Sequence, residues 1–568
     1  MIRPKTYLGV FLFCNKNELM KTRLFTILLI IANGVAIAQI HLTEAQVLKL
    51  DSIVTQDVPE EAPGIATAII SDGKLIYENY AGFENLIDMS MIDKNSRFNV
   101  ASNGKQFTAL AILILEDEGK INLKEDIRTY LPDIFKSLND KITIENLLHH
   151  TSGIRDVYDL WSLQGITWWK QTYRNVDVLN LIEEQIDLNF SPNSQYLYSN
   201  TNYILLAKII EKVTKKSFVE YTNMMFTKLN MNNTSFEDDY TKIQGPVAQS
   251  YFNFDTWTTY DWTWNVVGDG NLFSTLQDQI EWEKIVQGYG NSKIKKTLIE
   301  KSQHLDSLNN KFKYGYGLEF GKYKGLLYKF HEGATGAWKA TTVRFKNNSL
   351  SIITLTNSGK TLPSMQTRQM ADVIFKLNDN AEYLITEPEV IGAFVSEQDI
   401  LGVYLTPNNF SFEFKKNEDD NLVLVRIGRG ETELERESDN IFRQKYDPAF
   451  KQEFTKNDKG EMVVTAYYTT HAPYSLTRTE ADWSNYEYTQ INGKFVNDET
   501  NVELIITHDV DKKYKVVVNG QEINGVLVTP NKLLVNNYVI VFENQKGDIS
   551  SLILNSDRIK NVHFKRKM

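Results

Sequence analysis

Ser102 and Lys105 form an S-x-x-K pair at the head of a long apolar run, "FNVASNGKQFTALAILILEDEGK". If a helix begins near Ala101, residues at i and i+3 lie on one face, so the hydroxyl and the amine are neighbours. The run is apolar nearly all round, which is typical of a buried central helix, and Gly119 is well placed to end it in the left-handed conformation. Burial and the positive end of the helix dipole both favour the neutral form of Lys105.

A neutral amine beside a hydroxyl is a base next to a weak nucleophile, which is what attack on an acyl carbon requires. The backbone N–H of Ser102, unpaired at the start of the helix, is also able to donate to a developing oxyanion. The alternative is that Ser102 only caps the helix and Lys105 extends to solvent, because S-x-x-K also arises by chance. Other stretches of the sequence decide between the two.

Two polar residues, Tyr198 and Asn200, flank Ser199 in "YLYSNTNYILLAKIIEKVTKKS", just before a helical pattern that starts near Tyr203. A loop at this point presents both side chains. A tyrosine near Lys105 shares its proton as phenol or phenolate, and Asn200 is able to donate to a substrate carbonyl. The alternative for Tyr198 is a buried phenol that donates to a loop carbonyl.

The stretch "LLYKFHEGATGAWKATTVRF" places His331, Glu332 and Gly333 between two predicted strands. Gly333 permits a close approach of the backbone to a ligand. The N–H of Ala334 is a candidate for the second oxyanion donor, with His331 facing the cleft. The alternative is that His331 is a structural histidine at the end of a strand.

A fourth stretch, "ITIENLLHHTSGIRD", predicts a short helix and a turn that holds the nucleophile helix. Its two histidines, His149 and His150, point opposite ways on a helix. None of the eight histidines belongs to an H-E-x-x-H motif, so we expect no metal and no other cofactor. The aromatic clusters "WTTYDWTWNVVGDG" and "WSLQGITWWKQTY" either line a groove or pack loops, and the sequence assigns them no role.

Other hydrolase and nucleotide-binding patterns are missing from the sequence. There is no G-x-S-x-G elbow, and Gly359-Lys360-Thr361 lacks the upstream glycine of a phosphate loop. The formal net charge is −10, without a long basic stripe, which argues against a nucleic-acid partner. We therefore expect a small-molecule or peptide substrate, and the sequence leaves the oligomeric state open.

Residues 1–38 have the pattern of a signal peptide. Two basic residues, Lys21 and Arg23, precede "LFTILLIIANGVAIA", which ends in a small-x-small pattern and predicts cleavage before Gln39. The alternative, a transmembrane anchor, is disfavoured because the apolar run is short for a bilayer. We therefore expect a periplasmic or secreted protein without a stable membrane anchor, and Met20 is an alternative start.

The cysteine content agrees with this interpretation. Cys14, the one cysteine, lies in the presequence, so the processed chain has neither a disulfide nor a lipid-anchored cysteine.

The chain has 568 residues, 42% of them hydrophobic, enough for two or three domains. Strand-like and helical patterns alternate up to about residue 380, and from about residue 404 the segments are short strands with polar turns. "ILGVYL" with "NNFSFEF" resembles "INGKFV" with "TNVELII", and "EFTKNDKGEMVVTAY" resembles "VFENQKGDISSLILN". This repeat predicts two tandem antiparallel barrels, with domains at 39–385, 386–484 and 485–568.

Six ordered stretches between residues 45 and 380 resemble the serine beta-lactamase-related family, which includes penicillin-binding carboxypeptidases, class C beta-lactamases, esterases and D-aminopeptidases. They are "FNVASNGKQFTALAIL", "ITIENLLHHTSGI", "YLYSNTNYILLAKIIEKVTKKS", "GDGNLFSTLQDQIEW", "YGYGLEF" and "HEGATG". The resemblance implies an α+β catalytic domain, an antiparallel sheet flanked by helices. It also implies that Ser102 is the nucleophile, Lys105 its proton partner, Tyr198 a general base or relay, and Asn200 a substrate ligand.

The third motif departs from the penicillin-binding pattern, because His331-Glu332-Gly333 stands where that pattern has Lys-Thr-Gly. A neutral histidine lowers the expectation of beta-lactam or D-Ala-D-Ala turnover. His-x-Gly and two β-barrels resemble the D-aminopeptidase branch. We expect an exported serine hydrolase that forms an acyl-enzyme at Ser102 with D-residue-containing peptides or small amides and esters. The alternatives are a beta-lactamase or D,D-carboxypeptidase, and a non-catalytic penicillin-binding-like protein.

Overall fold

The computed structural model describes residues 40–305, 313–345, 349–377, 392–406, 411–426, 430–445, 450–467, 474–479, 481, 483–545 and 548–567. The predicted signal peptide and Cys14 lie outside the described residues. Within these ranges, no helix combines the length and the apolar composition that crossing a membrane requires.

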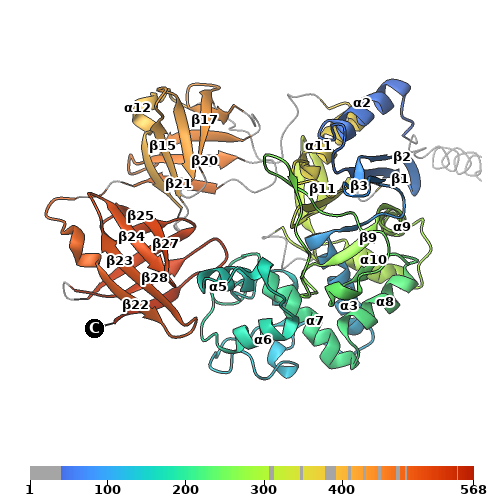
Figure 1. Ribbon diagram of the computed structural model, residues 1–568, viewed down its shortest axis with the longest axis horizontal. Coiled ribbons are helices and arrows are strands. Elements are labelled where there is room, and N and C mark those ends of the chain that lie inside the picture. Colours follow the sequence, from blue (N-terminus) through green and yellow to red (C-terminus); the bar gives the residue numbers. More distant parts are fainter. Residues whose placement is uncertain are drawn as a thin grey trace, which may run out of the picture. The chain divides into compact units, whose positions relative to one another are not determined.

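The first domain contains an antiparallel sheet of six strands, in the order β10-β11-β12-β13-β1-β2 (Figure 1). Its strands are β1 (Ile65–Ser71), β2 (Lys74–Ala81), β10 (Glu319–Tyr323), β11 (Leu326–Thr335), β12 (Trp338–Phe345) and β13 (Leu350–Thr356). β1 and β13 are buried at every position, so both faces of the sheet are covered. The covering helices are α2 (Glu44–Thr55), α11 (Pro363–Phe375) and α9 (Leu276–Val286).

A helical region adjoins this sheet. It contains α3 (Lys105–Asp117), α4 (Ile144–Leu148), α5 (Val157–Leu163), α6 (Asn175–Glu183), α7 (Asn200–Thr214), α8 (Phe218–Lys228) and α10 (Lys296–Ser302). Helix α3 is preceded by the 3-10 turn η1 (Ala101–Gly104) and is buried from Lys105 to Leu115. Gly119 follows it with φ +67°, so the predicted buried helix and its left-handed end are both confirmed.

Short strands and turns complete the first domain. They are β3 (Phe83–Asn85), β4 (Ser90–Met91), β5 (Arg97–Asn99), β6 (Ser235–Phe236), β7 (Phe252–Asn253), β8 (Trp257–Thr258), β9 (Leu272–Thr275), η2 (Ile127–Thr129), η3 (Trp168–Lys170) and η4 (Tyr240–Lys242). The order β5-β9-β6 places β5, which leads into η1, beside β9. The approach to Ser102 is thereby fixed by backbone pairing.

Two closed antiparallel barrels of eight strands follow. After α12 (Glu397–Ile400), the first comprises β14 (Gly402–Leu405), β15 (Ser411–Lys416), β16 (Leu422–Arg426), β17 (Glu431–Arg436), β18 (Ile441–Gln444), β19 (Lys451–Lys456), β20 (Met462–Tyr467) and β21 (Tyr474–Arg478). After η6 (Tyr488–Ile491), the second comprises β22 (Gly493–Asn497), β23 (Val502–His508), β24 (Lys513–Val518), β25 (Gln521–Thr529), β26 (Lys532–Val535), β27 (Tyr538–Gln545), β28 (Asp548–Asn555) and β29 (Val562–Lys567).

The internal repeat that predicted these barrels is confirmed strand by strand. The first pair of similar stretches forms β14-β15 and β22-β23, the opening hairpins of the two barrels. The second pair forms β19-β20 and β27-β28, the sixth and seventh strands of each barrel. The α+β catalytic domain and the all-β C-terminal region are therefore both present.

The second barrel packs against the helical region. Its apolar residues share one buried cluster with those of α3 and α7. Arg155, just before α5, is 1% exposed and forms an ion pair with Glu499 at 2.5 Å. Its guanidinium also donates to the carbonyl oxygens of Lys560 and Asn561, at 3.1 and 2.9 Å. A buried ion pair with these additional hydrogen bonds fixes the loop between β28 and β29 in place.

Candidate active site

The turn η1 presents Ser102 at the start of the buried helix. Ala101, directly before it, has φ +47°, a left-handed conformation that costs a non-glycine residue roughly 1–2 kcal/mol. The side chain of Asn99 holds this turn, because its Oδ1 accepts from the Ala101 N–H at 3.0 Å and its Nδ2 donates to Asn271 Oδ1 at 3.0 Å. Ser102 is partly exposed, whereas both neighbouring residues are buried. Backbone strain of this kind is concentrated at functional positions.

Lys105 points at the Ser102 hydroxyl. Its Nζ lies 3.0 Å from Ser102 Oγ and donates to Asn200 Oδ1 at 2.9 Å and to the carbonyl oxygen of Asp269 at 2.5 Å. The side chain is completely buried. Burial lowers the pKa of Lys105 to about 7, although the nearby carboxylate of Asp269 acts in the opposite direction. The amine is therefore neutral in a large fraction of molecules at neutral pH, in the direction that the sequence predicted.

Tyr198 lies over the Lys105 amine, with Nζ 4.9 Å from the centroid of the ring. Burial raises the pKa of Tyr198 well above its usual range, and its hydrogen bond with Ser102 only partly offsets this. The phenol is thus protonated at neutral pH. The sequence left two forms of Tyr198 open, a phenol and a phenolate. The raised pKa favours the neutral phenol, which relays a proton, and disfavours a phenolate that acts as the base.

Asn200 is the first residue of α7, which begins three residues earlier than the pattern near Tyr203 predicted. Its backbone N–H and its side-chain Nδ2 both donate to Asp156 Oδ2, at 2.7 and 2.9 Å. The other oxygen of Asp156 accepts from the N–H of Tyr158 and caps α5. This anchoring directs the Oδ1 of Asn200 at the Lys105 amine. The sequence predicted Asn200 as a substrate ligand, and the structure shows it as a partner of Lys105.

The turn after α4, which the sequence predicted to hold the helix after Ser102, bonds the loop that carries Tyr198. The Nδ1 atom of His150 accepts from the N–H of Ser199 at 3.2 Å and contacts Asn202 Nδ2 at 3.1 Å. The rings of His150 and Tyr198 lie 4.3 Å apart. Burial lowers the pKa of His150 well below its usual value, so it acts here as a neutral acceptor.

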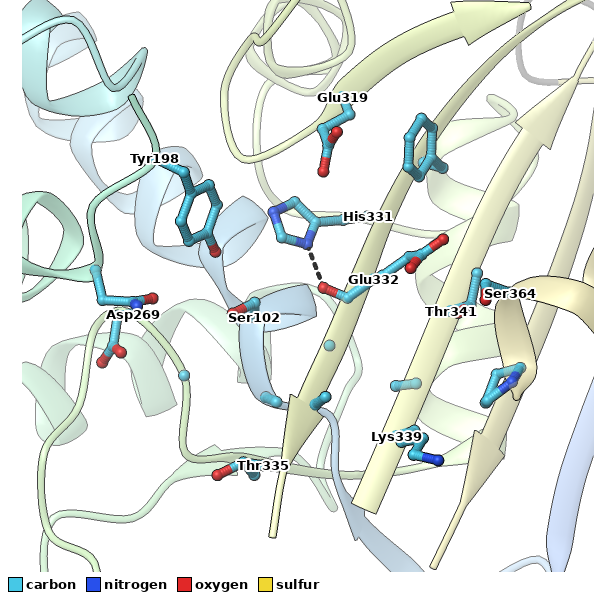
Figure 2. Close-up of a pocket in the computed structure, with 18 of the residues that line it drawn as sticks. Ser102, Tyr198, Asp269, Glu319, His331, Glu332, Thr335, Lys339, Thr341 and Ser364 are labelled. Carbon is cyan, nitrogen blue, oxygen red and sulfur yellow. Dashed lines mark hydrogen bonds between the residues drawn. The ribbon is translucent and has the colours of Figure 1, made fainter. Parts of the chain in front are cut away.

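His331, Glu332 and Gly333 lie inside the continuous strand β11 and do not separate two strands, as the sequence suggested. His331 Nδ1 donates to the carbonyl oxygen of Glu332 at 2.8 Å (Figure 2). Its Nε2 is 3.2 Å from the hydroxyl of Tyr314. Both contacts are satisfied by the tautomer protonated at Nδ1, with Tyr314 donating. Burial lowers the pKa of His331 to about 3, so this position carries no cation.

Gly333 allows β11 to pass directly beside the turn that carries Ser102. A β-carbon at this position would lie 2.2 Å from the carbonyl oxygen of Val100 and 3.1 Å from the amide nitrogen of Ser102. The sequence predicted a close approach to a ligand here, and the close approach that the structure shows is to the backbone of the turn. Ala334, the next residue, lines the cavity together with Ser102, as the predicted oxyanion pair requires.

A cavity of about 1650 Å³ opens over Ser102. Trp168, Trp169 and Trp264 line it, so the aromatic clusters to which the sequence assigned no role contribute to the cavity wall. Glu319, from β10, faces the same space near His331 (Figure 2). Burial raises the pKa of Glu319 to about 8, and the neighbouring Glu332 adds to this rise. The cavity is large enough for a peptide-sized ligand.

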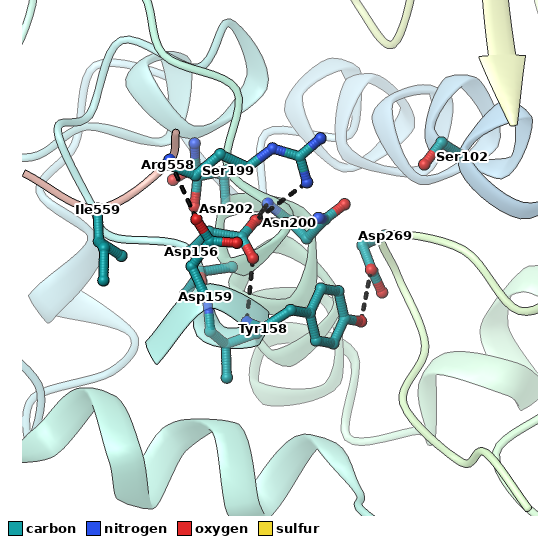
Figure 3. A network of polar contacts seen from close by, with 12 residues as sticks. Ser102, Asp156, Tyr158, Asp159, Ser199, Asn200, Asn202, Asp269, Arg558 and Ile559 are labelled. Atoms are coloured by element: carbon teal, nitrogen blue, oxygen red, sulfur yellow. Dashed lines mark hydrogen bonds and ion pairs between the residues drawn. The ribbon is translucent and has the colours of Figure 1, made fainter. Parts of the chain in front are cut away.

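Four residues of the site were missed from the sequence: Asp156, Tyr158, Asp269 and Arg558. The Tyr158 hydroxyl donates to Asp269 Oδ2 at 2.7 Å, which orients the loop whose carbonyl accepts from Lys105 (Figure 3). "GDG", around Asp269, was the available signal. No local signal pointed to Arg558, because its loop belongs to the second barrel.

A family model and curated proteins each match part of the chain. A family model described as Beta-lactamase matches residues 50–375. Protein flp of Staphylococcus aureus (strain MRSA252) is 33% identical over 207 residues, which cover 36% of this chain and 40% of flp. Penicillin-binding protein 4* of Bacillus subtilis (strain 168) is 27% identical over 307 residues, which cover 50% of this chain and 66% of that protein. The match with flp thus spans about 40% of the length of that relative.

Solved structures resemble a longer part of the chain. The octameric penicillin-binding protein homologue from Pyrococcus abyssi covers 92% of this chain and 100% of its own, with a TM-score of 0.53 and 19% identity. SurE with D-Leu covers 77% of this chain and 99% of its own, with a TM-score of 0.51 and 17% identity. At these identities, the similarity concerns the fold.

Proposed function

Because the chain belongs to the beta-lactamase family, we propose that it is a serine hydrolase that acts on D-residue-containing peptides or small amides and esters. One observation carries this proposal: the buried Lys105 amine lies 3.0 Å from Ser102 Oγ, and burial lowers its pKa to about 7. An amine in this state accepts the hydroxyl proton as the oxygen attacks a carbonyl carbon.

The proposed reaction has two steps. Ser102 Oγ adds to the carbonyl carbon while Lys105 takes the hydroxyl proton, and the oxyanion is stabilised by the N–H groups of Ser102 and Ala334. The C–N or C–O bond then breaks, and the leaving group receives a proton relayed from Lys105 through the Tyr198 phenol. Water then attacks the acyl-serine, and Lys105 takes one proton from this water. Lys105 passes that proton to Ser102 Oγ as the ester bond breaks, which releases the carboxylic acid and the free serine.

The preference for D-residue-containing substrates rests on the third motif. The neutral His331 occupies the position where the penicillin-binding pattern has a lysine, and this pattern resembles the D-aminopeptidase branch. A screen of D-amino-acid amides, esters and beta-lactams against the purified protein tests this preference. Efficient turnover of beta-lactams alone would assign the chain to the beta-lactamase alternative.

Formation of the acyl-enzyme is tested by intact-mass analysis after treatment with a serine-reactive fluorophosphonate, beside the Ser102→Ala variant. We expect a single adduct in the native chain and none in the variant. A folded protein without an adduct would favour a non-catalytic, penicillin-binding-like protein.

We also propose that the chain is exported, on the basis of the basic and apolar sequence before Gln39. N-terminal sequencing of the protein recovered from periplasm or medium should begin at Gln39. Recovery of the uncleaved chain in the cytoplasm would contradict the proposal.

A further inference from the structure

We propose that Arg558, in the second barrel, binds a carboxylate carried by the leaving group of the substrate. The inference rests on the proposed function of Ser102 and adds a determinant of specificity that lies outside the catalytic domain. Arg558 belongs to the loop between β28 and β29, and it lines the same cavity as Ser102 and Tyr198.

The backbone of Arg558 is fixed against the catalytic domain. Its N–H donates to Asp159 Oδ2 at 3.1 Å, and its carbonyl oxygen accepts from Asn189 Nδ2 at 3.1 Å. The flanking Ser556 also donates to Asp159, and the N–H of Lys560 donates to Asn189 Oδ1, at 2.9 and 2.6 Å. The loop therefore delivers the Arg558 side chain to one place, which is the pre-organisation that a binding residue needs.

The guanidinium of Arg558 retains unused donors. Among the described residues, its guanidinium forms one ion pair, a long contact of 4.0 Å between Nη1 and Asp156 Oδ2 (Figure 3). That oxygen already accepts two shorter hydrogen bonds from Asn200. The Arg558 side chain is 42% exposed and faces the cavity, so most of its five N–H groups are available to a ligand. Asp156 therefore orients the Arg558 guanidinium and leaves most of its N–H donors free for a ligand.

The position of the Arg558 guanidinium beside Tyr198 indicates which part of a bound substrate lies next to it. The Cζ atom of Arg558 lies 5.1 Å from the centroid of the Tyr198 ring. Because Tyr198 is the proposed proton relay to the leaving group, an anion beside Arg558 belongs to that part of the substrate. A planar guanidinium with parallel donors matches a carboxylate in a bidentate arrangement.

Three other groups that line the cavity, His331, Arg344 and Lys339, do not supply this charge. His331 is neutral, because burial lowers its pKa to about 3. Arg344, which also lines the cavity, is buried in an ion pair with Glu283 at 2.6 Å. Lys339 donates to the carbonyl oxygens of Gly359 and Thr361, at 2.6 and 2.9 Å. Arg558 therefore takes the place of the cation that the third motif lacks.

The test uses two N-acetyl-D-alanyl thioesters that differ only in the leaving group, mercaptoacetate or mercaptoacetamide. Release of the thiol gives kcat/KM for each, after subtraction of spontaneous hydrolysis. We expect the native protein to prefer the carboxylate, and Arg558→Gln to lower the ratio of the two kcat/KM values by about 10- to 100-fold. Arg558→Lys should recover part of the ratio, because it keeps the positive charge but loses the paired N–H donors that bind a carboxylate in a bidentate arrangement.

The matched control is Lys565→Gln, which removes one positive charge from an exposed position of β29 in the same barrel. Its ratio should stay within about twofold of the native value, since screening limits the effect of a distant surface charge. An unchanged ratio in a folded Arg558→Gln protein that still hydrolyses both thioesters would overturn the inference and leave the proposed function intact. Absence of turnover and of the fluorophosphonate adduct in the native protein would instead refute the proposed function.

Discussion

The Nζ atom of Lys105 lies 2.9 Å from Oδ1 of Asn200, the same residue whose two N–H donors hold Asp156. The amine that faces Ser102 is thus positioned through Asn200 by the cap of a separate helix, α5. A carbonyl from the Asp269 loop supplies a second fixed acceptor. The geometry of the S-x-x-K pair depends on elements about 50 to 165 residues away in the sequence.

Replacement of Lys105 by methionine should abolish acylation. Met has a similar length and suits a buried site, so the fold should persist while the proton acceptor is lost. We expect the rate of fluorophosphonate labelling to fall by at least about 10³-fold. Lys49→Met, at an exposed position of α2, is the control for the loss of one lysine and should label normally. Labelling of folded Lys105→Met at the native rate would refute the mechanism.

The reaction should depend on pH through the Lys105 amine. Burial lowers its pKa to about 7, so the active neutral form increases as the pH rises through 7. An ordinary lysine would be neutral in only about 1 in 3,000 molecules at pH 7. We expect kcat/KM to rise about tenfold per pH unit below 7 and to level off above it. A rise with its midpoint near pH 10 would show that burial does not lower this pKa.

Tyr198→Phe should slow the reaction less than Lys105→Met, by about 10- to 100-fold in kcat, because the phenol relays a proton and is not the base. The raised pKa of Tyr198 implies that the rise of kcat/KM near pH 7 persists in this variant. Full pH profiles of both proteins check this. Loss of that rise in Tyr198→Phe would assign the base to Tyr198.

Gly333→Ala should damage both stability and activity, since its β-carbon would lie 2.2 Å from the Val100 carbonyl oxygen. Overpacking of this kind costs about 1–3 kcal/mol, and the shift would displace Ser102. Gly460→Ala is the contrasting variant, because Gly460 has φ +78° and nothing within 4 Å of an added β-carbon. It should lose about 1 kcal/mol in urea unfolding and keep its labelling rate. Equal labelling rates in both variants would show that the Gly333 contact does not position the nucleophile.

Glu319→Gln should stabilise the protein at high pH. The pKa of Glu319 is raised to about 8 in the folded protein, so the folded state binds more protons than the unfolded state between pH 4.5 and 8. The free energy of unfolding of the native protein therefore decreases as the pH rises through this range. The variant has no ionisable group at this position, so its free energy of unfolding does not decrease for this reason. The difference in Tm, variant minus native, should increase from pH 5 to pH 9. A difference that stays constant would place Glu319 in a solvated environment.

Local patterns predicted the elements that carry the site. The buried helix after Ser102, its end at Gly119 and the two barrels followed from periodicity, a turn residue and an internal repeat. Local patterns failed where long-range pairing decides the outcome. The stretch around His331 looked like a break between strands, yet pairing of residues 328–335 with β12 keeps it in one strand.

The sequence by itself determined the residue types of the proposed reaction: Ser102 as its nucleophile, the amine of Lys105, Tyr198, and a third motif without a lysine. Their order and spacing are local properties, and a family resemblance extends over them. Only the tertiary structure decided which groups hold them. Asp156, Asp269 and Arg558 meet around Lys105 and Tyr198 because chain closure brings α5, the Asp269 loop and the second barrel together. Burial, which sets the pKa of Lys105 and the neutrality of His331, is likewise a property of the assembled fold.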